Sequence, residues 1–405
     1  MGESIGRLLV APALAMLLCL AGCGGGGGGG NSPPPPPPPT QNVASVVVDG
    51  GPANVPDLPF VSVTVCAPGS SSNCQTIDHV QIDTGSTGLR IIASVLSPAL
   101  SLPQQTDASG NPLAECAQFV DGFSWGSVRV ADIHIVGEQA NSVPIQIIGD
   151  PGFPTIPASC SSAGPPENTV ATFGANGLLG VGPFLQDCGG GCAQAAIPGT
   201  YYTCPATGCQ PTQVALAKQL QNPVAMFDMD NNGVIVQLPS VSAAGAATAS
   251  GSLIFGIGTQ ANNGLGGATV LTVNPNTGNI VTTYNGRMYA NSYIDAGSSV
   301  LFFEINAFPI CTGVARGFYC PPTTQNLSAT LQGISSGTSS VSFSVANADQ
   351  LFNANPSFNA FNNLAVPSGD TTTFAWGLPF FFGRSVFTAI EGRNTPGGTG
   401  PYFAF

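Results

Sequence analysis

The chain has 405 residues, of which 43% are hydrophobic and only 7% are charged, and it contains 53 glycines and 36 prolines. Its 8 basic and 20 acidic residues give a net charge of −12, and because no basic run could neutralise phosphates we exclude a nucleic-acid partner. The shortage of Lys, Glu and Arg and the excess of turn residues favour an all-β architecture with many short strands and few short helices. The length suffices for two or three domains, and we expect a monomer.

The N-terminus has the pattern of an export signal. Arg7 precedes the apolar run LLVAPALAMLLCLAG, which ends at Cys23 and is too short to span a bilayer comfortably. The sequence LAGC resembles a bacterial lipobox, in which the cysteine is diacylated and becomes the new N-terminus. We therefore interpret residues 1–22 as a lipoprotein signal peptide and Cys23 as the lipidation site. The alternative is an ordinary secretory peptide that is cleaved nearby.

Residues 23–42 follow as a tether. Residues 24–30 are all glycine and residues 33–39 are all proline, so a flexible segment is followed by a stiff polyproline II segment. Together with one lipid anchor, this spacer would hold a folded body near a membrane without embedding it. We expect a lipoprotein of the bacterial cell envelope, anchored to the inner or the outer membrane on its periplasmic or surface side.

The cysteine count agrees with export. Twelve cysteines are present. Cys19 lies in the signal peptide and Cys23 would carry the lipid, which leaves an even number in an exported chain and indicates disulfides. Local pairs are plausible at Cys66 with Cys74, Cys204 with Cys209, and Cys311 with Cys320, whereas Cys188 and Cys192 bracket three glycines and stay unassigned. No pair of short cysteine motifs comes with a usable histidine, so we expect no metal and no cofactor.

One acidic turn occurs twice, in separate halves of the chain. VQIDTGSTGLRI starts at Val80 and SYIDAGSSVLFF starts at Ser292, and each places one aspartate between an apolar strand and a glycine turn. The two aspartates are Asp83 and Asp295. The residues that follow them are Thr84, Gly85 and Ser86 in the first copy and Ala296, Gly297 and Ser298 in the second. A single such turn is weak evidence because Asp, Gly and Ser are common in turns, but two copies in apolar frames are a stronger signal.

Paired carboxylates have a definite chemistry. Two aspartates about 3 Å apart cannot both ionise, so they share one proton and titrate as a coupled pair. One carboxylate can then take a proton from water while the other gives a proton to a carbonyl oxygen. If Asp83 and Asp295 meet, the sequence therefore predicts hydrolysis of a peptide bond by activated water, with Ser86 and Ser298 as donors that orient the two carboxylates.

The two turns resemble those of pepsin-like aspartic proteases, and the resemblance extends over residues 60–405. GANGLLGVGPF from Gly174 is similar to the strand that supports the first turn of that family, and Phe381, Phe382 and Gly383 would give the equivalent support to the second turn. GSLIFGIGTQ from Gly251 is similar to a strand ahead of the second aspartate. The chain also resembles a family of bacterial lipoproteins that is related to these proteases and has no established function.

The resemblance implies a bilobal fold, in which two similar double β-barrel or sandwich lobes enclose an active-site cleft. The N-terminal lobe would comprise residues 43–222 and the C-terminal lobe residues 223–405. The segment FVDGF, which contains Phe119 and Gly122, corresponds to the flap hairpin over the cleft. An extended polypeptide would bind in the cleft through backbone hydrogen bonds along strand edges.

Three positions depart from the family pattern. Ala296 replaces the second of two threonines that brace the turns, which leaves Thr84 alone and removes about 0.5–1.5 kcal/mol for one hydrogen bond. Phe119 stands at the position of the flap tyrosine and has no hydroxyl to donate. Arg90 replaces the tryptophan that partners this tyrosine, and its charge is expected to lower the pKa of a nearby carboxylate pair.

Two further segments have competing interpretations. FDMDNNG from Phe227 begins like a calcium loop, but the twelfth position from Asp228 is Pro239 instead of the bidentate glutamate. We therefore expect a hairpin turn at Asn232 and Gly233. VALAKQLQN from Val214 is one of few helix-like stretches and lies where the first lobe would hand over to the second.

Two functions from different classes are compatible with these features. The first is a lipid-anchored aspartic endopeptidase, a hydrolase with Asp83 and Asp295 as its catalytic pair. The second is a pepsin-shaped lipoprotein that binds peptides or proteins and has little or no turnover. The presence of both aspartates favours the enzyme, while Ala296, Phe119 and Arg90 favour the binding protein.

Overall fold

The computed structural model describes residues 41–405. The signal peptide, the lipidation site at Cys23 and all but the last two residues of the tether lie outside the described residues, so these assignments stay predictions. Within the described part of the chain, no helix is both long and apolar enough to cross a membrane.

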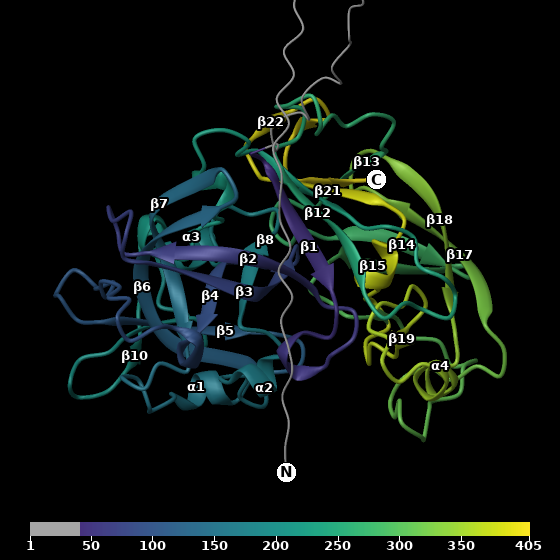
Figure 1. Cartoon of the computed structure of the whole chain (residues 1–405), viewed down its shortest axis with the longest axis horizontal. Coiled ribbons are helices and arrows are strands. Elements are labelled where there is room, and N and C mark those ends of the chain that lie inside the picture. The colour runs from purple at the N-terminus through teal and green to yellow at the C-terminus, as the bar shows by residue number, and fades with distance from the viewer. Residues whose placement is uncertain (1–40) are drawn as a thin grey trace, which may run out of the picture. The chain divides into compact units, whose positions relative to one another are not determined.

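Strands dominate the fold, as the composition predicts, and all helices are short (Figure 1). The strands up to residue 211 are β1 (Val43–Val48), β2 (Pro59–Cys66), β3 (Cys74–Asp83), β4 (Thr87–Ile92), β5 (Leu113–Gln118), β6 (Phe123–Ile135), β7 (Glu138–Ile148), β8 (Gly177–Val181), β9 (Tyr201–Thr203) and β10 (Gln210–Pro211). The later strands are β11 (Gly233–Gln237), β12 (Ala249–Phe255), β13 (Val270–Thr272), β14 (Ile280–Tyr284), β15 (Arg287–Ile294), β16 (Leu301–Phe302), β17 (Gln325–Gln332), β18 (Thr338–Val345), β19 (Ala365–Val366), β20 (Ala375–Trp376), β21 (Ser385–Ala389), β22 (Asn394–Thr395), β23 (Gly398–Thr399) and β24 (Tyr402–Ala404).

The helical elements serve as connections between strands. The α-helices are α1 (Ala158–Ser161), α2 (Val170–Phe173), α3 (Gly189–Gln194) and α4 (Ala348–Ala354). The 3₁₀ turns are η1 (Gly51–Ala53), η2 (Ala93–Val95), η3 (Leu216–Lys218), η4 (Val224–Met226) and η5 (Leu378–Phe380). The expectation of an all-β protein with few short helices is confirmed.

Six strands of the first half form a closed ring. The sheet order runs β6-β7-β4-β8-β3-β2, and β2 pairs again with β6 through Thr64–His134 and Val65–Ile133. Closure leaves no free strand edge in this ring, and the inward side chains pack into one core. Val63, Ile145 and Leu179 are among its fully buried members.

The second half contains a seven-stranded sheet in the order β18-β17-β14-β15-β20-β16-β19, which lies on the right in Figure 1. Aromatic rings fill its core. Phe374 stacks on Phe303 with 4.6 Å between ring centroids and on Trp376 with 4.3 Å. Such stacked pairs add about 0.5–1.5 kcal/mol each beyond the burial of their area.

One sheet of 15 strands runs through both halves. Its continuity depends on β1, which pairs with β2 on one side and, over its own full length, with β12 on the other, from Val43–Ile254 to Val48–Ala249. The outer members of this sheet, β11, β21, β24 and β13, belong to the C-terminal half. The predicted boundary between residues 222 and 223 is thus crossed by main-chain hydrogen bonds, and the lobe boundaries themselves stay predictions.

Two local predictions were wrong. The stretch from Val214 forms only the short turn η3, because Leu220 is buried and side-chain amides take over the backbone acceptors: Gln219 Nε2 donates to the carbonyl of Val214 at 2.9 Å. Asn232 and Gly233 do not join two strands. β11 begins at Gly233 and pairs with β12 and β21, while the Asn232 side chain is buried and bonds to the carbonyls of Ile257 and Asn394.

Five disulfides cross-link the described residues. Three are the local pairs that the spacing suggested, namely Cys66–Cys74, Cys204–Cys209 and Cys311–Cys320. Cys188 bonds to Cys192, a pair that the sequence left open. The fifth, Cys116–Cys160, closes the longest loop and fixes β5 to α1.

We predict that replacing Cys116 and Cys160 with serine destabilises the protein more than replacing Cys204 and Cys209. The sequence separations are 44 and 5 residues, and loop-closure entropy assigns these cross-links about 4 and about 2 kcal/mol. Urea unfolding of the two double variants measures the difference. Equal losses of unfolding free energy would contradict the prediction.

Candidate active site

The two acidic turns stand on the same strand arrangement. β3 carries Asp83 at its end and pairs in parallel with β8, which in turn pairs antiparallel with the returning strand β4. In the second half β15 leads to Asp295 and pairs in parallel with β20, which pairs antiparallel with the returning strand β16. The main chain therefore builds the same support around each aspartate.

The supporting strand of the second turn differs from the sequence-based assignment. Asp83 lies opposite Gly180 of β8, within the segment expected from GANGLLGVGPF. Next to Asp295, however, lies β20, and the Asp295 N–H donates to the carbonyl of Trp376 at 3.0 Å. Phe381 and Phe382 are buried in the core after η5, so the expectation that they support the turn directly was wrong. Trp376 and Phe382 are both apolar and are both followed by glycine, so the two segments share one sequence pattern.

Each carboxylate is held by its own turn in the same way. The Gly85 N–H donates to Oδ1 of Asp83 at 2.7 Å, and the Gly297 N–H donates to Oδ1 of Asp295 at 2.7 Å. The Ser86 hydroxyl donates to Oδ2 of Asp83. In the second turn the Ser298 hydroxyl donates to Oδ2 of Asp295 at 2.7 Å. The structure thus places both serines as the donors that the sequence predicted.

The two turns pack against each other, and the glycine of each turn contacts the aspartate of the other turn. A Cβ atom at Gly85 would lie 2.8 Å from Cγ of Asp295, and a Cβ atom at Gly297 would lie 2.7 Å from Cγ of Asp83. Both aspartates are buried, with 6% and 8% of their surface exposed. The chain therefore brings its two acidic turns together into one site, and the absence of a side chain at Gly85 and Gly297 permits this close approach.

Thr84 is the one threonine that bridges the turns, as expected because Ala296 stands at the position of the second threonine. The Ala296 N–H donates to Oγ1 of Thr84 at 2.8 Å, and Oγ1 of Thr84 lies 3.5 Å from the carbonyl of Ile294. Ala296 is fully buried and offers no hydroxyl for the reciprocal bond.

Two further polar residues at the site escaped the sequence analysis. Gln81 donates from Nε2 to the carbonyl of Gly297 at 2.8 Å and so adds a second bond between the turns. Tyr293 is half-buried on β15. Each lies two residues before an aspartate, and strand alternation puts it on the same face as that aspartate. The position two residues before each aspartate is the sequence signal that would have identified Gln81 and Tyr293.

Electrostatics agree with a coupled pair. Burial, the charge of Asp83 and a hydrogen bond with the Asp83 carboxyl raise the pKa of Asp295 well above its usual range, against the donors Ser298 and Gly297. Burial and the charges of Asp295 and Asp83 also raise the pKa of Tyr293 to about 12. Asp295 therefore retains a proton to a higher pH than an isolated aspartate does.

Arg90 does not act as the sequence analysis expected. Its guanidinium is buried and bonds to Glu115 at 2.6 Å, with Asp187 at 3.6 Å, so its charge is neutralised within the N-terminal half. The pKa of Asp295 is raised, whereas an arginine acting on the pair would lower it. Arginine fits here because strand β5 supplies a buried carboxylate at Glu115.

Phe119 and Gly122 form the tip of the hairpin between β5 and β6. The Phe119 N–H donates to the carbonyl of Gly122 at 2.8 Å, and the Phe119 ring meets Phe173 edge-on at 6.0 Å. A Cβ atom at Gly122 would lie 2.4 Å from the carbonyl oxygen of Pro165. The tip thus packs on the segment before and within α2, and its role as a flap over the site stays a prediction.

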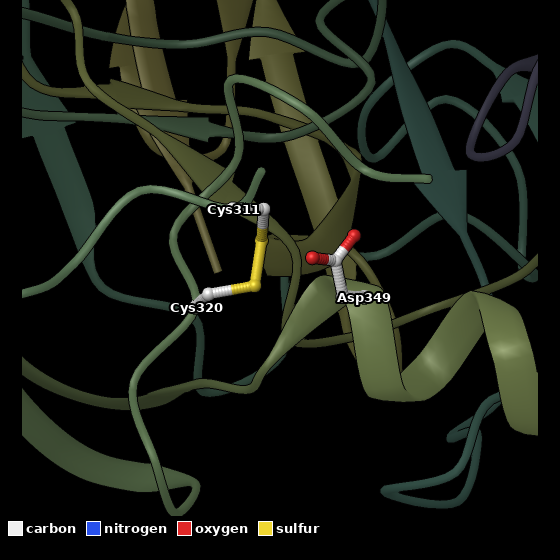
Figure 2. A group of neighbouring side chains, drawn as sticks. All are labelled: Cys311, Cys320 and Asp349. Carbon is white, nitrogen blue, oxygen red and sulfur yellow. A yellow bond between two sulfur atoms is a disulfide. The ribbon is translucent and has the colours of Figure 1, made fainter. Parts of the chain in front are cut away.

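One group of sulfur and carboxylate atoms has metal-like spacing. One ligand atom each from Cys311, Cys320 and Asp349 lies within 4.8 Å of the other two. Figure 2 shows the three side chains. The two sulfurs form a disulfide, and the carboxylate of Asp349 accepts the N–H groups of Gly313 and Ala315. A disulfide offers no thiolate for a metal ion, so this arrangement serves to fix the loop of residues 311–320 to the start of α4.

We predict that Gly85→Ala and Gly297→Ala each destabilise the protein by about 1–3 kcal/mol, because the added methyl group overlaps the opposite carboxyl group. Gly267→Ala is the matched control, since a Cβ atom there would meet no atom within 4 Å. Thermal unfolding of the three variants measures the effect. Site variants as stable as the control would show that the two turns do not touch.

A second acidic contact joins the two halves away from this site. Glu138, on β7, is buried near the loop that precedes β11, and burial together with the charge of Asp230, a hydrogen bond with Asp230 and the charge of Asp228 raises the pKa of Glu138 to about 7. Asp230 accepts hydrogen bonds from Thr259 and from Gln260. Glu138 thus keeps a proton in the folded protein over a pH range in which the unfolded chain loses it.

This difference predicts a pH-dependent effect of Glu138→Gln. Because the folded pKa is raised from 4.5 to about 7, the wild-type protein loses stability as the pH rises through this interval, and an uncharged glutamine avoids that loss. The variant should unfold at the same temperature as wild type near pH 4.5 and at a higher temperature near pH 8. A lower unfolding temperature of the variant near pH 8 would contradict this assignment.

Comparison with known proteins gives a family without an assigned activity. Residues 38–405 match the model of a family described as "Protein of unknown function (DUF3443)". No curated protein matches the chain. The function must therefore be inferred from the site.

Proposed function

The chain belongs to this family of unknown function, and we propose that it is an aspartic endopeptidase that hydrolyses peptide bonds with Asp83, Asp295 and an activated water. One observation carries the proposal: two buried carboxyl groups, each held by a glycine N–H and a serine hydroxyl, pack against each other's turns. Structural ion pairs do not need this duplicated support, whereas a general acid and a general base do.

The proposed fold is a bilobal pepsin-like arrangement with the aspartates at the junction of its lobes. Supporting it are the repeated strand plan around Asp83 and Asp295 and the bonds that join the two turns through Thr84 and Gln81. In this arrangement each lobe provides one acid, and an extended polypeptide lies between them.

The proposed reaction follows from the protonation states. The water oxygen attacks the carbonyl carbon of the peptide bond while Asp83 accepts a proton from the water and Asp295 gives its proton to the carbonyl oxygen. The tetrahedral diol then breaks its C–N bond. Asp83 returns its proton to the leaving nitrogen, and Asp295 regains a proton from a diol hydroxyl. The raised pKa of Asp295 supports this assignment of acid and base.

We further propose that the enzyme acts in the bacterial cell envelope on unfolded or extended exported polypeptides, held near a membrane by a lipid on Cys23. The disulfides support an oxidising compartment. The lipid assignment rests on the LAGC sequence alone.

Ala296 favours a second candidate, a peptide-binding protein with little turnover. The residue removes one of the two threonine bonds that would brace the turns, and a pair held by Thr84 and Gln81 without the second threonine is less rigid. Binding of extended peptides between the lobes does not require that rigidity.

The test is cleavage of casein and of a peptide library by the full-length protein between about pH 3 and pH 7. We predict that Asp83→Asn and Asp295→Asn each lower kcat by at least about 100-fold, because each removes one proton-transfer group. A statine-type inhibitor should block the wild-type activity. As the pH rises above the pKa of Asp295, activity should fall because the proton that it donates is lost.

Asp228→Asn provides the matched control, since this exposed aspartate lies outside the site. Activity that survives both site substitutions would refute the peptidase. Binding of library peptides without cleavage at any pH would select the second candidate instead.

A further inference from the structure

A surface pocket of about 570 Å³ opens in the C-terminal half, between the β17–β18 hairpin and the segment from η5 to β21. Its volume falls in the range of small-molecule sites. Both polar and aromatic groups line it, including Ser342, Ser344, Phe343, Phe380, Phe382 and Arg384. The pocket is separate from the paired aspartates.

Arg384 is the only charged residue in the lining. Its guanidinium lies over the Phe380 ring, with 4.6 Å from Cζ to the ring centroid, and donates to the carbonyls of Phe380 at 2.5 Å and Ser342 at 3.4 Å. Burial lowers the pKa of Arg384, but an arginine stays positively charged in proteins. The side chain is thus a partly desolvated cation.

Within residues 41–405 this cation has no carboxylate within 4.0 Å. Arg90 and Arg129, by contrast, each form ion pairs. A partly buried charge without a counter-ion is costly, and the protein has an excess of acidic groups from which a partner could have been placed. A guanidinium has five N–H donors, and the two contacts above leave three of them for a ligand.

A second polar group in the lining also lacks a partner. Asn362 donates from Nδ2 to the carbonyl of Val241 at 3.0 Å, but its Oδ1 atom is buried and accepts no hydrogen bond from the described residues. An unsatisfied buried acceptor costs about 1–3 kcal/mol. Rotation of the Asn362 side chain toward the pocket would offer Oδ1 to a ligand N–H group.

The apolar part of the pocket touches the support of the second acidic turn. Phe343 and Phe380 meet Trp376 edge-on, at 5.2 and 5.4 Å between ring centroids. The Trp376 carbonyl in turn accepts the N–H of Asp295. These rings offer an apolar surface for a hydrocarbon or aromatic side chain.

We propose that this pocket binds an N-acylated apolar amino acid, the chemistry of a free peptide C-terminus that ends in an apolar residue. The carboxylate pairs with Arg384, the side chain packs on Phe343 and Phe380, and the amide N–H donates to Oδ1 of Asn362 once that side chain rotates toward the pocket. Arginine with its planar fork suits a carboxylate that it can contact through two N–H groups. The proposal stands independently of the peptidase, because it concerns binding and not turnover.

Calorimetric titration of the full-length protein tests the proposal with N-acetylphenylalanine as the probe. N-acetylphenylalanine amide has the same acetyl group and side chain but no carboxylate charge, and it should bind at least about tenfold more weakly. Arg384→Gln should weaken binding of the acid by at least about tenfold. Arg287→Gln is the matched control, because Arg287 lies over the Tyr289 ring in the same half, outside the pocket, and its variant should bind as wild type does.

Ser344→Trp keeps Arg384 and fills the pocket, so it should abolish binding while circular dichroism shows an unchanged fold. Longer peptides that end in phenylalanine should compete with the probe if the source of the carboxylate is a peptide end. Equal affinity for the acid and the amide would overturn the proposal, as would full binding by Arg384→Gln or no binding by wild type at about 10 mM probe. Equally strong binding of inorganic phosphate would also overturn it, because the apolar body would then contribute nothing.

Discussion

The packing of two carboxyl groups against each other's turns is the constraint on which the rest of the structure depends. Two like charges that are buried together repel and lose hydration, so the pair is stable only while one proton stays bound. The turns supply two donors to each acid, and Thr84 and Gln81 bind the turns to each other. The surrounding strands have to hold these few atoms in place, which explains why the same strand plan is built twice.

The preference for protonated acids extends beyond the site. Burial raises the pKa of Asp57 well above its usual range, although the Phe361 N–H donates to Oδ1 and acts in the opposite direction; its Oδ2 atom has no hydrogen-bond partner among the described residues. Burial and the charge of Glu115 similarly raise the pKa of Asp187, despite Arg90. A chain with 8 basic and 20 acidic residues has few cations to pair with buried acids, so it buries several of them as neutral groups. Each such group favours the folded state more at low pH than at high pH.

The sequence was sufficient for the all-β class and for the short-range disulfides, because strand alternation, turn residues and cysteine spacing are local patterns. The meeting of Asp83 and Asp295 was expected from the repeated turn and from the family resemblance, not from a local pattern. The sequence-based predictions were wrong where tertiary packing determines the local structure or the partner of a side chain. The buried Leu220 and the amide of Gln219 override the helix-like pattern after Val214. Arg90 could not be assigned correctly, because its partners Glu115 and Asp187 are distant in sequence. The disulfide Cys116–Cys160 was not predicted for the same reason, because 44 residues separate its two cysteines.

The ladder between β1 and β12 has a mechanical consequence. Six residue pairs join the first described strand to the second half of the chain, and β2 continues that ladder into the closed ring. Rotating one half away from the other would shear these hydrogen bonds simultaneously, which is far costlier than bending a loop. Any ligand that reaches the acidic pair must therefore be admitted by small excursions of hairpins and surface loops, with the two halves moving as one body.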